Sequence, residues 1–208
     1  MKYILFLFLV VAATGKVSGQ PPLYLGAEVQ GHYLRFFEVP DISLTSGNNY
    51  ELGGGLSGFY ALNSGWRLYF GLTGAMVHQK LYQSGNRFIF TGVPLLIQWQ
   101  KPVKNLRGNF FLRSGIRTEY LARVTHRYGG GNVEITRYTR PFYFSGIVAA
   151  GYGSKMKNQK EWAIYVGARS TIGGSFPQYT GNSAGPSFGM GSVFLAVANY
   201  LPVKKKQE

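Results

Sequence analysis

Residues 109–124 read NFFLRSGIRTEYLARV, and this stretch indicates the fold more clearly than any other. Apolar and polar residues alternate along it with a period of two, which is the pattern of a β-strand with one apolar face. The apolar face consists of Phe110, Leu112, Ile116, Tyr120 and Val124. The other face carries Arg113, Gly115, Arg117 and Glu119. A shift by one residue would move every charge onto the apolar face, so the sequence specifies the orientation of this strand.

The same period recurs along the rest of the chain, and no segment after residue 20 keeps the spacing of an amphipathic helix. We predict eight strands, which cover residues 23–35, 49–62, 66–77, 87–100, 109–124, 140–153, 161–172 and 187–202. Pro94 lies inside the fourth strand and leaves its register open, because proline cannot donate to a strand ladder. The eighth strand is apolar on both faces, so the sequence does not orient it.

Short and long connections alternate in strict order between these strands. The short ones are residues 63–65, 101–108 and 154–160. The long ones are residues 36–48, 78–86, 125–139 and 173–186. This alternation is typical of an up-and-down antiparallel meander whose two ends face different compartments. Eight strands in such a meander can close into a barrel and leave no free edge.

A period of two leaves open whether the apolar faces point into the barrel or out of it. A soluble barrel of the lipocalin type buries them, whereas a membrane barrel exposes them. The polar faces here carry few charges, and the strands match the ~9–11 residues needed to cross a bilayer. Aromatic residues also gather near the ends of the apolar faces, as in membrane barrels: Tyr33, Tyr50, Tyr60, Trp66, Trp99, Phe110, Tyr120, Phe142, Tyr152 and Trp162. We therefore predict an all-β protein, an eight-stranded antiparallel up-and-down transmembrane β-barrel.

The amino-acid composition excludes several kinds of functional site. The 208 residues include no cysteine, which excludes disulfides, thiolate zinc sites and thiol nucleophiles. Lys and Arg number 22 against 8 Asp and Glu, giving a net charge of +14. An excess of this size raises the question of nucleic acid or another anionic partner.

The N-terminal segment answers that question, because residues 1–19 have the three parts of a secretory signal peptide. Lys2 supplies the basic start, residues 3–13 form a short apolar run, and Val17 and Gly19 occupy the −3 and −1 positions of the cleavage site. We expect an exported protein that does not meet nucleic acid. The expected mature chain is a barrel over residues 20–203, followed by a basic periplasmic tail over residues 204–208.

If the apolar faces meet lipid, seven charged side chains point into the barrel. These are Glu28, Glu51, Arg67, Arg113, Arg117, Glu119 and Arg169. Because an unpaired buried charge is very costly, we expect them to form a network of ion pairs that makes the interior rigid. The alternative is a narrow gated pore, which would prefer anions because four arginines face three carboxylates.

Three histidines fall near the long connections. His32, His78 and His126 could meet at one mouth of the barrel, but no spacing enforces a metal site. Ser84 and Glu134 lie in neighbouring connections without a catalytic motif. We expect no catalytic residue, no metal and no cofactor.

The connection around residues 129–131 is rich in glycine and basic residues. Two interpretations stay open: charge-assisted contacts to the phosphates of an anionic glycolipid, or a basic surface that is simply solvated. The residues expected to make these contacts are Arg123, Arg127, Arg137 and Arg140.

Two stretches resemble the PorT-like outer-membrane β-barrel proteins of double-membraned bacteria. Residues 92–97 read GVPLLI, similar to a Pro-Leu-Leu stretch in the family's central strand, and residues 111–116 read FLRSGI, where the family has a strand with glycine. The resemblance covers nearly the whole mature chain. It departs at the end, where Tyr200 is followed by further residues, whereas such barrels commonly end on an aromatic.

The resemblance implies a monomeric barrel in the cell outer membrane with a non-catalytic role: structural, surface-binding, or accessory to transport or secretion. Expected partners are outer-membrane lipid, anionic glycolipid and other envelope or secretion proteins. Two alternatives stay open at this point. One is a soluble exported barrel of the lipocalin type that binds a hydrophobic ligand, and the other is a lipid-modifying enzyme with its site at the rim.

Overall fold

The structure is a computed structural model, and it describes residues 23–37, 49–80, 84–104, 106–128, 130–134, 136, 142–156, 158–172 and 189–203. The predicted signal peptide and the basic tail lie outside these residues. No helix among them is long and apolar enough to span a membrane.

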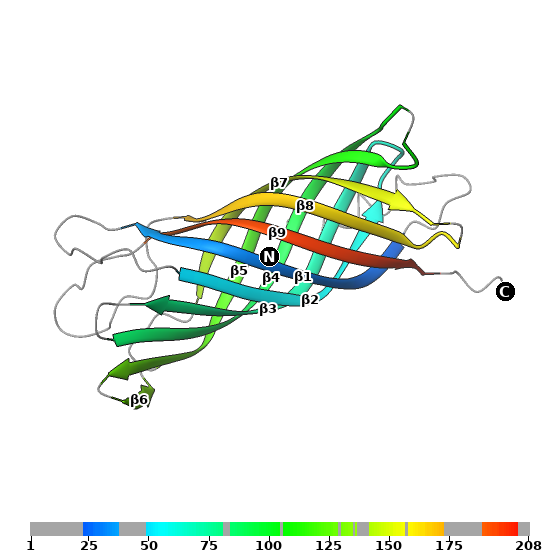
Figure 1. Cartoon of the computed structure of the whole chain (residues 1–208). Coiled ribbons are helices and arrows are strands. Elements are labelled where there is room, and N and C mark those ends of the chain that lie inside the picture. The colour runs from blue at the N-terminus through cyan, green and yellow to red at the C-terminus, as the bar shows by residue number, and fades with distance from the viewer. Residues whose placement is uncertain are drawn as a thin grey trace, which may run out of the picture.

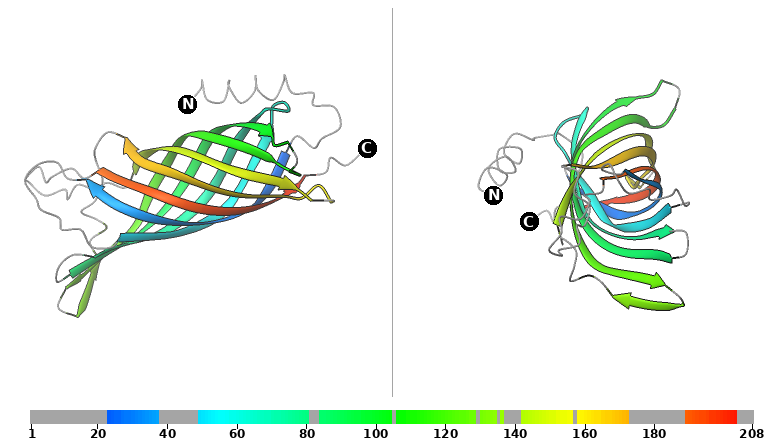
Figure 2. Two further views of the ribbon diagram at one scale, coloured as in Figure 1. Left: turned by 45° about the horizontal axis from the view of Figure 1, so that its top comes forward. Right: turned by 90° about the vertical axis from the view of Figure 1, so that its left-hand side faces the viewer.

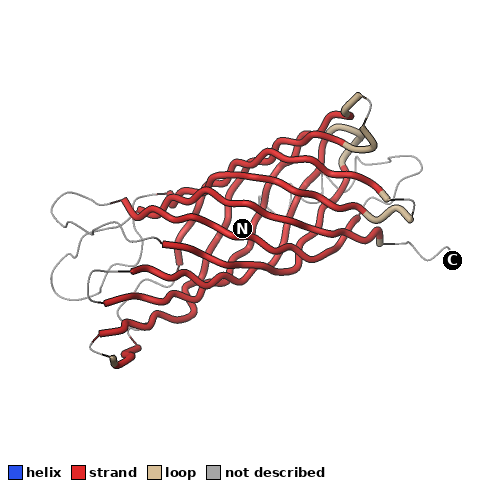
Figure 3. Tube along the Cα trace, in the orientation of Figure 1, coloured by secondary structure: helices blue, strands red, loops and turns tan. Residues whose placement is uncertain are grey.

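Eight long strands and one short strand account for nearly all the described residues (Figures 1 and 3). They are β1 (Leu23–Phe37), β2 (Asn49–Ala61), β3 (Trp66–Lys80), β4 (Ser84–Pro102), β5 (Asn109–Tyr128), β6 (Gly131–Glu134), β7 (Phe142–Lys155), β8 (Glu161–Ile172) and β9 (Gly189–Pro202). All pairings are antiparallel, in the order β4-β3-β2-β1-β9-β8-β7-β5-β6. The additional β4–β5 pairing closes the sheet into a barrel (Figure 2), and this confirms the predicted eight-stranded up-and-down barrel.

The barrel has two different ends. At the turn end, the described parts of the compact connections are residues 62–65, 103–104, 106–108, 156 and 158–160, shown in tan in Figure 3. At the loop end, β4 and β5 reach farther than predicted, because Ser84 pairs with Tyr128 and β6 folds back onto β5. Figure 1 shows β6 at the tip of this extension, which we call the β4–β5 hairpin extension (residues 84–90, 121–128 and 130–134).

One interruption of the ladder corrects the predicted strand faces. Between β4 and β5, Ile89 pairs with Arg123 and Phe90 pairs with Leu121, so Ala122 is an extra residue in a β-bulge. The bulge turns Val124 inward, where it is 1% exposed, instead of leaving it on the apolar outer face. The prediction for Val124 was therefore wrong, because one inserted residue reverses the alternation beyond it.

Pro94 interrupts the ladder in a second place. The register of β3 and β4 runs through Phe70 with Leu95 and resumes at Thr73 with Gly92. Proline has no N–H to donate between these two pairs. The hydroxyl of Thr73 donates to the carbonyl of Gly92 at 3.1 Å, which adds a bond across the gap.

The apolar faces of the strands point outward. Twenty-eight large hydrophobic side chains are 40–72% exposed, among them Val29, Leu56, Val148 and Val193. The alternative of a lipocalin-type barrel is wrong, because that barrel would bury these faces. β9, which the sequence did not orient, places Phe194, Ala196 and Ala198 inside and the intervening valines and leucine outside.

The interior is filled in layers from one end to the other. An upper apolar cluster fills the loop end and consists of Leu34, Val77, Phe88, Phe90, Leu121, Val124, Tyr143 and Met190. Below it lie buried charges, and toward the turn end lies a second cluster that includes Tyr24, Phe59, Phe111, Tyr165 and Tyr200. The core of this protein is thus a packed lumen rather than a space between sheets.

Candidate functional site

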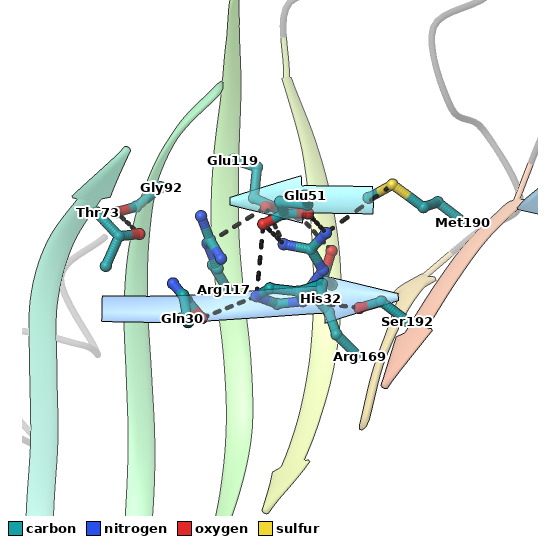
Figure 4. A network of polar contacts seen from close by, with 11 residues as sticks. Gln30, His32, Glu51, Thr73, Gly92, Arg117, Glu119, Arg169, Met190 and Ser192 are labelled. Atoms are coloured by element: carbon teal, nitrogen blue, oxygen red, sulfur yellow. Dashed lines mark hydrogen bonds and ion pairs between the residues drawn. The ribbon is translucent and has the colours of Figure 1, made fainter. Parts of the chain in front are cut away.

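The upper half of the lumen holds a chain of ion pairs around Arg169 on β8 (Figure 4). Its two Nη atoms donate to both carboxylate oxygens of Glu51 on β2, and Nη1 also lies 3.1 Å from Oε1 of Glu119 on β5. Arg117 Nε lies 3.2 Å from the same oxygen of Glu119. These four side chains are at most 2% exposed, so each charge depends on its partners rather than on solvent.

His32 joins this group from β1. Its Nδ1 lies 3.0 Å from the Ser192 hydroxyl, and its Nε2 lies 3.0 Å from Gln30 Oε1 and 3.5 Å from Glu51 (Figure 4). The expectation that His32 lies at the mouth was wrong, because its place in the alternation puts it on the inner face of β1. It is a packed member of the network rather than a residue of the connection that follows β1.

The other two histidines lie elsewhere. His78 stacks on Tyr50 with ring centroids 5.1 Å apart, and His126 Nδ1 lies 2.7 Å from Asn86 Oδ1. Among the described residues, no group of three His, Cys, Asp or Glu side chains is placed to hold a metal ion.

The middle of the lumen holds Glu28 and Arg113, which rely on neutral partners. Glu28 accepts hydrogen bonds from the hydroxyls of Tyr69 and, at 3.5 Å, Ser57. Arg113 donates to Gln98 Oε1 at 2.8 and 3.2 Å, and its guanidinium lies 3.9 Å from the ring centroid of Tyr69. A cation over an aromatic face in a dry interior gains an attraction that partly replaces a carboxylate.

The turn end of the lumen holds a pair that the sequence reasoning missed. Both Nη atoms of Arg67 donate to the carboxylate of Glu161, and the guanidinium lies 4.1 Å from the Phe59 ring centroid. Glu161 is 5% exposed and shares the parity of Tyr165 and Arg169 along β8, a signal that could have identified it.

Including Glu161 changes the charge balance of the lumen. Four arginines now face four glutamates among the buried described residues, with the charged members being Glu28, Glu51, Arg67, Arg113, Arg117, Glu119, Glu161 and Arg169. The excess of positive charge on which the anion-selective pore depended is therefore absent.

The predicted glycolipid contacts lie on the β4–β5 hairpin extension. Arg123 binds Glu134 at 3.1 Å, with both side chains more than half exposed, and Arg127 is exposed. The register places Arg87, opposite Thr125, on the same outer face as Arg123 and Arg127. Arg87 was not among the predicted contacts. Arg137 and Arg140 lie outside the described residues, as does the Ser84 side chain.

No family model matches the sequence, and no curated protein matches it. Among solved structures, the chain is similar to Neisserial surface protein A, with a TM-score of 0.49 and 13% identity, covering 85% of this chain and 96% of that one. It is also similar to Ail, the attachment invasion locus protein of Yersinia pestis, with a TM-score of 0.43 and 12% identity, covering 86% and 98%. For the N-terminal β-barrel domain of OprF from Pseudomonas aeruginosa, the TM-score is 0.42 and the identity 12%, covering 88% and 100%. Similarity at this level describes the fold alone.

Proposed function

We propose that the protein is an integral outer-membrane barrel whose long strands span the bilayer, with its loop end outside and its turn end in the periplasm. The observation that carries this proposal is the apolar outer face. Within the described strands, no charged side chain faces outward between the upper aromatic residues, such as Tyr120, and the lower ones, such as Phe110. In water this surface would promote aggregation, whereas a bilayer covers it.

The dimensions of the outer face support the same proposal. At about 3.3 Å per residue, the stretch of β5 from Phe110 to Tyr120 is about 33 Å long. A strand tilt of about 40° reduces its height to about 25 Å, which is the apolar band of an outer-membrane barrel. Aromatic pairs lie at both limits of the band, with Tyr120 and Phe142 5.0 Å apart and Tyr152 and Trp162 5.7 Å apart.

The role proposed for the barrel is structural and surface-binding rather than catalytic or conducting. The upper apolar cluster closes the loop end of the lumen, with Val77, Phe90 and Leu121 each at most 1% exposed. An ion entering there would lose its hydration without a compensating partner. Below this layer, Glu51, Arg169 and Glu119 occupy the cross-section with their mutual ion pairs.

The surface-binding part of the proposal concerns anionic glycolipid. Arg87, Arg123 and Arg127 lie on the outer face of the β4–β5 hairpin extension, beyond the upper limit of the apolar band. Guanidinium groups bind phosphate oxygens through paired, charge-assisted hydrogen bonds. We therefore place glycolipid phosphates beside the β4–β5 hairpin extension.

A finer assignment rests on the sequence around Pro94. The stretch at residues 92–97 supports membership of the PorT-like group, and with it an accessory role in secretion. The interruption beside Pro94 is the structural counterpart of that stretch. Co-purification of secretion proteins with the barrel, under mild detergent extraction, tests this assignment.

The experiment that tests the membrane proposal combines fractionation with gel migration. The protein should stay in the outer-membrane fraction after a high-salt and alkaline wash, and detergent should release it. Unboiled and boiled samples should then migrate differently, because a closed barrel stays folded in the detergent until it is heated. Recovery of the folded protein in the periplasmic fraction without detergent would contradict the proposal.

A further inference from the structure

The turn end of the barrel contains a pocket that the proposed function does not use. Its volume is about 350 Å³, which is within the ~300–1,000 Å³ of small-molecule sites. It lies among the ends of β1, β2, β3, β4, β5, β7 and β8. Tyr24, which stacks on Phe59 with ring centroids 4.6 Å apart, is one of its lining residues. The pocket is therefore a vestibule that can be reached from the turn side.

The charges that line the vestibule are unequal. Arg67, Arg107 and Lys155 line it, and Glu161 is the single carboxylate among its lining residues. Glu161 already accepts hydrogen bonds from both Nη atoms of Arg67. A positive excess in a concave site attracts anions.

One hydrogen-bond donor of Arg67 has no partner. Its Nε is buried and has no hydrogen-bond partner, although the side chain is 4% exposed and lines the vestibule. A buried donor without a partner costs about 1–3 kcal/mol, so Glu161 satisfies the Arg67 guanidinium only in part.

Hydrogen bonds and a close backbone contact hold together the segments that carry these cationic side chains. The hydroxyl of Ser154 on β7 donates to the carbonyl of Arg107, which ties the 103–108 turn to the strand that ends at Lys155. A Cβ at Gly108 would lie 2.4 Å from the carbonyl oxygen of Gly153, so only glycine allows this close approach. Opposite this turn, Gln100 donates to the carbonyl of Ser64 at 3.1 Å. Preorganised walls reduce the cost of binding.

We propose that this turn-end vestibule binds an oxyanion, either the carboxylate of a small peptide or a phosphate group. Arg107 and Lys155 bind it at the rim, and the positive charge of Arg67 attracts it from the floor. Neutral hydrogen-bonding side chains beside them, Asn63 and Asn109, contact the rest of the ligand. The site faces the periplasm in the orientation proposed above, but its chemistry does not depend on that orientation.

The test uses the full folded barrel in detergent micelles, with three probes: inorganic phosphate, N-acetyl-alanyl-alanine, and the C-terminal amide of that dipeptide. Binding is measured by calorimetry and by the ¹⁵N shift of the Arg67 side chain. We expect saturable binding of phosphate or of the free dipeptide, a shift of the Arg67 Nε–H signal, and no binding of the amide. The tighter of the two anions identifies the source of the oxyanion.

Variants decide whether the vestibule is the site. Arg107→Gln and Lys155→Gln each remove a charge-assisted contact, and each should weaken binding about tenfold. Lys104→Gln is the matched control, because Lys104 lies in the same turn as Arg107 without lining the vestibule. Unchanged heat-dependent migration shows that every variant is folded. Absence of binding for both anions, or an equal loss in Lys104→Gln, would overturn the proposal.

Discussion

Arg169 and Glu51 are 118 positions apart in the chain and form a two-pronged ion pair across the lumen. Their strands, β8 and β2, are not neighbours, since β9 and β1 lie between them in the sheet. The pair therefore connects opposite parts of the barrel wall rather than reinforcing one ladder. Both side chains are at most 1% exposed, so solvent does not screen the attraction.

The first prediction concerns this pair. Glu51→Gln leaves the Arg169 guanidinium buried with Glu119 as its one remaining carboxylate. Removing one partner of a buried pair costs about 3–5 kcal/mol, because the other charge stays desolvated. The expected loss is measured by urea unfolding of the barrel in lipid vesicles. Glu134→Gln is the control, since its pair with Arg123 is more than half exposed and should change stability by less than about 1 kcal/mol.

A second prediction concerns Gly92, which allows Arg117 to lie against the backbone of β4. A Cβ at Gly92 would lie 2.3 Å from Arg117 Nε and 3.0 Å from its Nη2. Gly92→Ala should therefore displace the guanidinium from Glu119 and destabilise the barrel by about 1–3 kcal/mol. Gly74→Ala on β3 serves as the comparison, because the nearest atom to its Cβ would be the carbonyl oxygen of Phe90 at 3.8 Å. Equal unfolding midpoints for the two variants would show that Arg117 moves aside without loss.

A third prediction tests the membrane exposure of the outer face. Val148 and Val133 are 58% and 61% exposed, but Val148 lies midway along β7 and Val133 lies on β6, beyond the apolar band. Val148→Arg should destabilise the barrel folded in vesicles by about 2–4 kcal/mol, and Val133→Arg by about 0–1 kcal/mol. A soluble barrel would tolerate both substitutions alike, so similar values for the two would contradict a spanning barrel.

The sequence predicted the outer face well because lipid enforces alternation strictly. Leu112, Ile116 and Tyr120 face outward as expected, and the eight strands have nearly their predicted bounds. The prediction failed at Val124, because alanine at position 122 fits either face and a period of two cannot reveal an inserted residue.

The sequence predicted which charged side chains lie in the lumen, but not which of them form ion pairs. Alternation placed Glu51, Glu119 and Arg169 in the lumen, yet it could not show which of them meet. Contacts across a lumen depend on the stagger of strands around the closed barrel, which no local pattern encodes. Glu161 was missed for a simpler reason: it is the first residue of its strand, where the alternation has only just begun.

The last prediction separates the three arginines of the β4–β5 hairpin extension. Arg123 already binds Glu134, whereas Arg87 donates to the uncharged thioether of Met76, and Arg127 forms no ion pair with any described residue. Arg87→Gln and Arg127→Gln should therefore each weaken binding to vesicles containing lipid A several-fold, and Arg123→Gln should weaken it less, because its charge is partly neutralised. Arg107→Gln removes the same charge at the turn end and should leave this binding unchanged. If all four variants lose binding equally, the interaction depends on net charge rather than on this face, and raising the salt concentration should abolish it in every case.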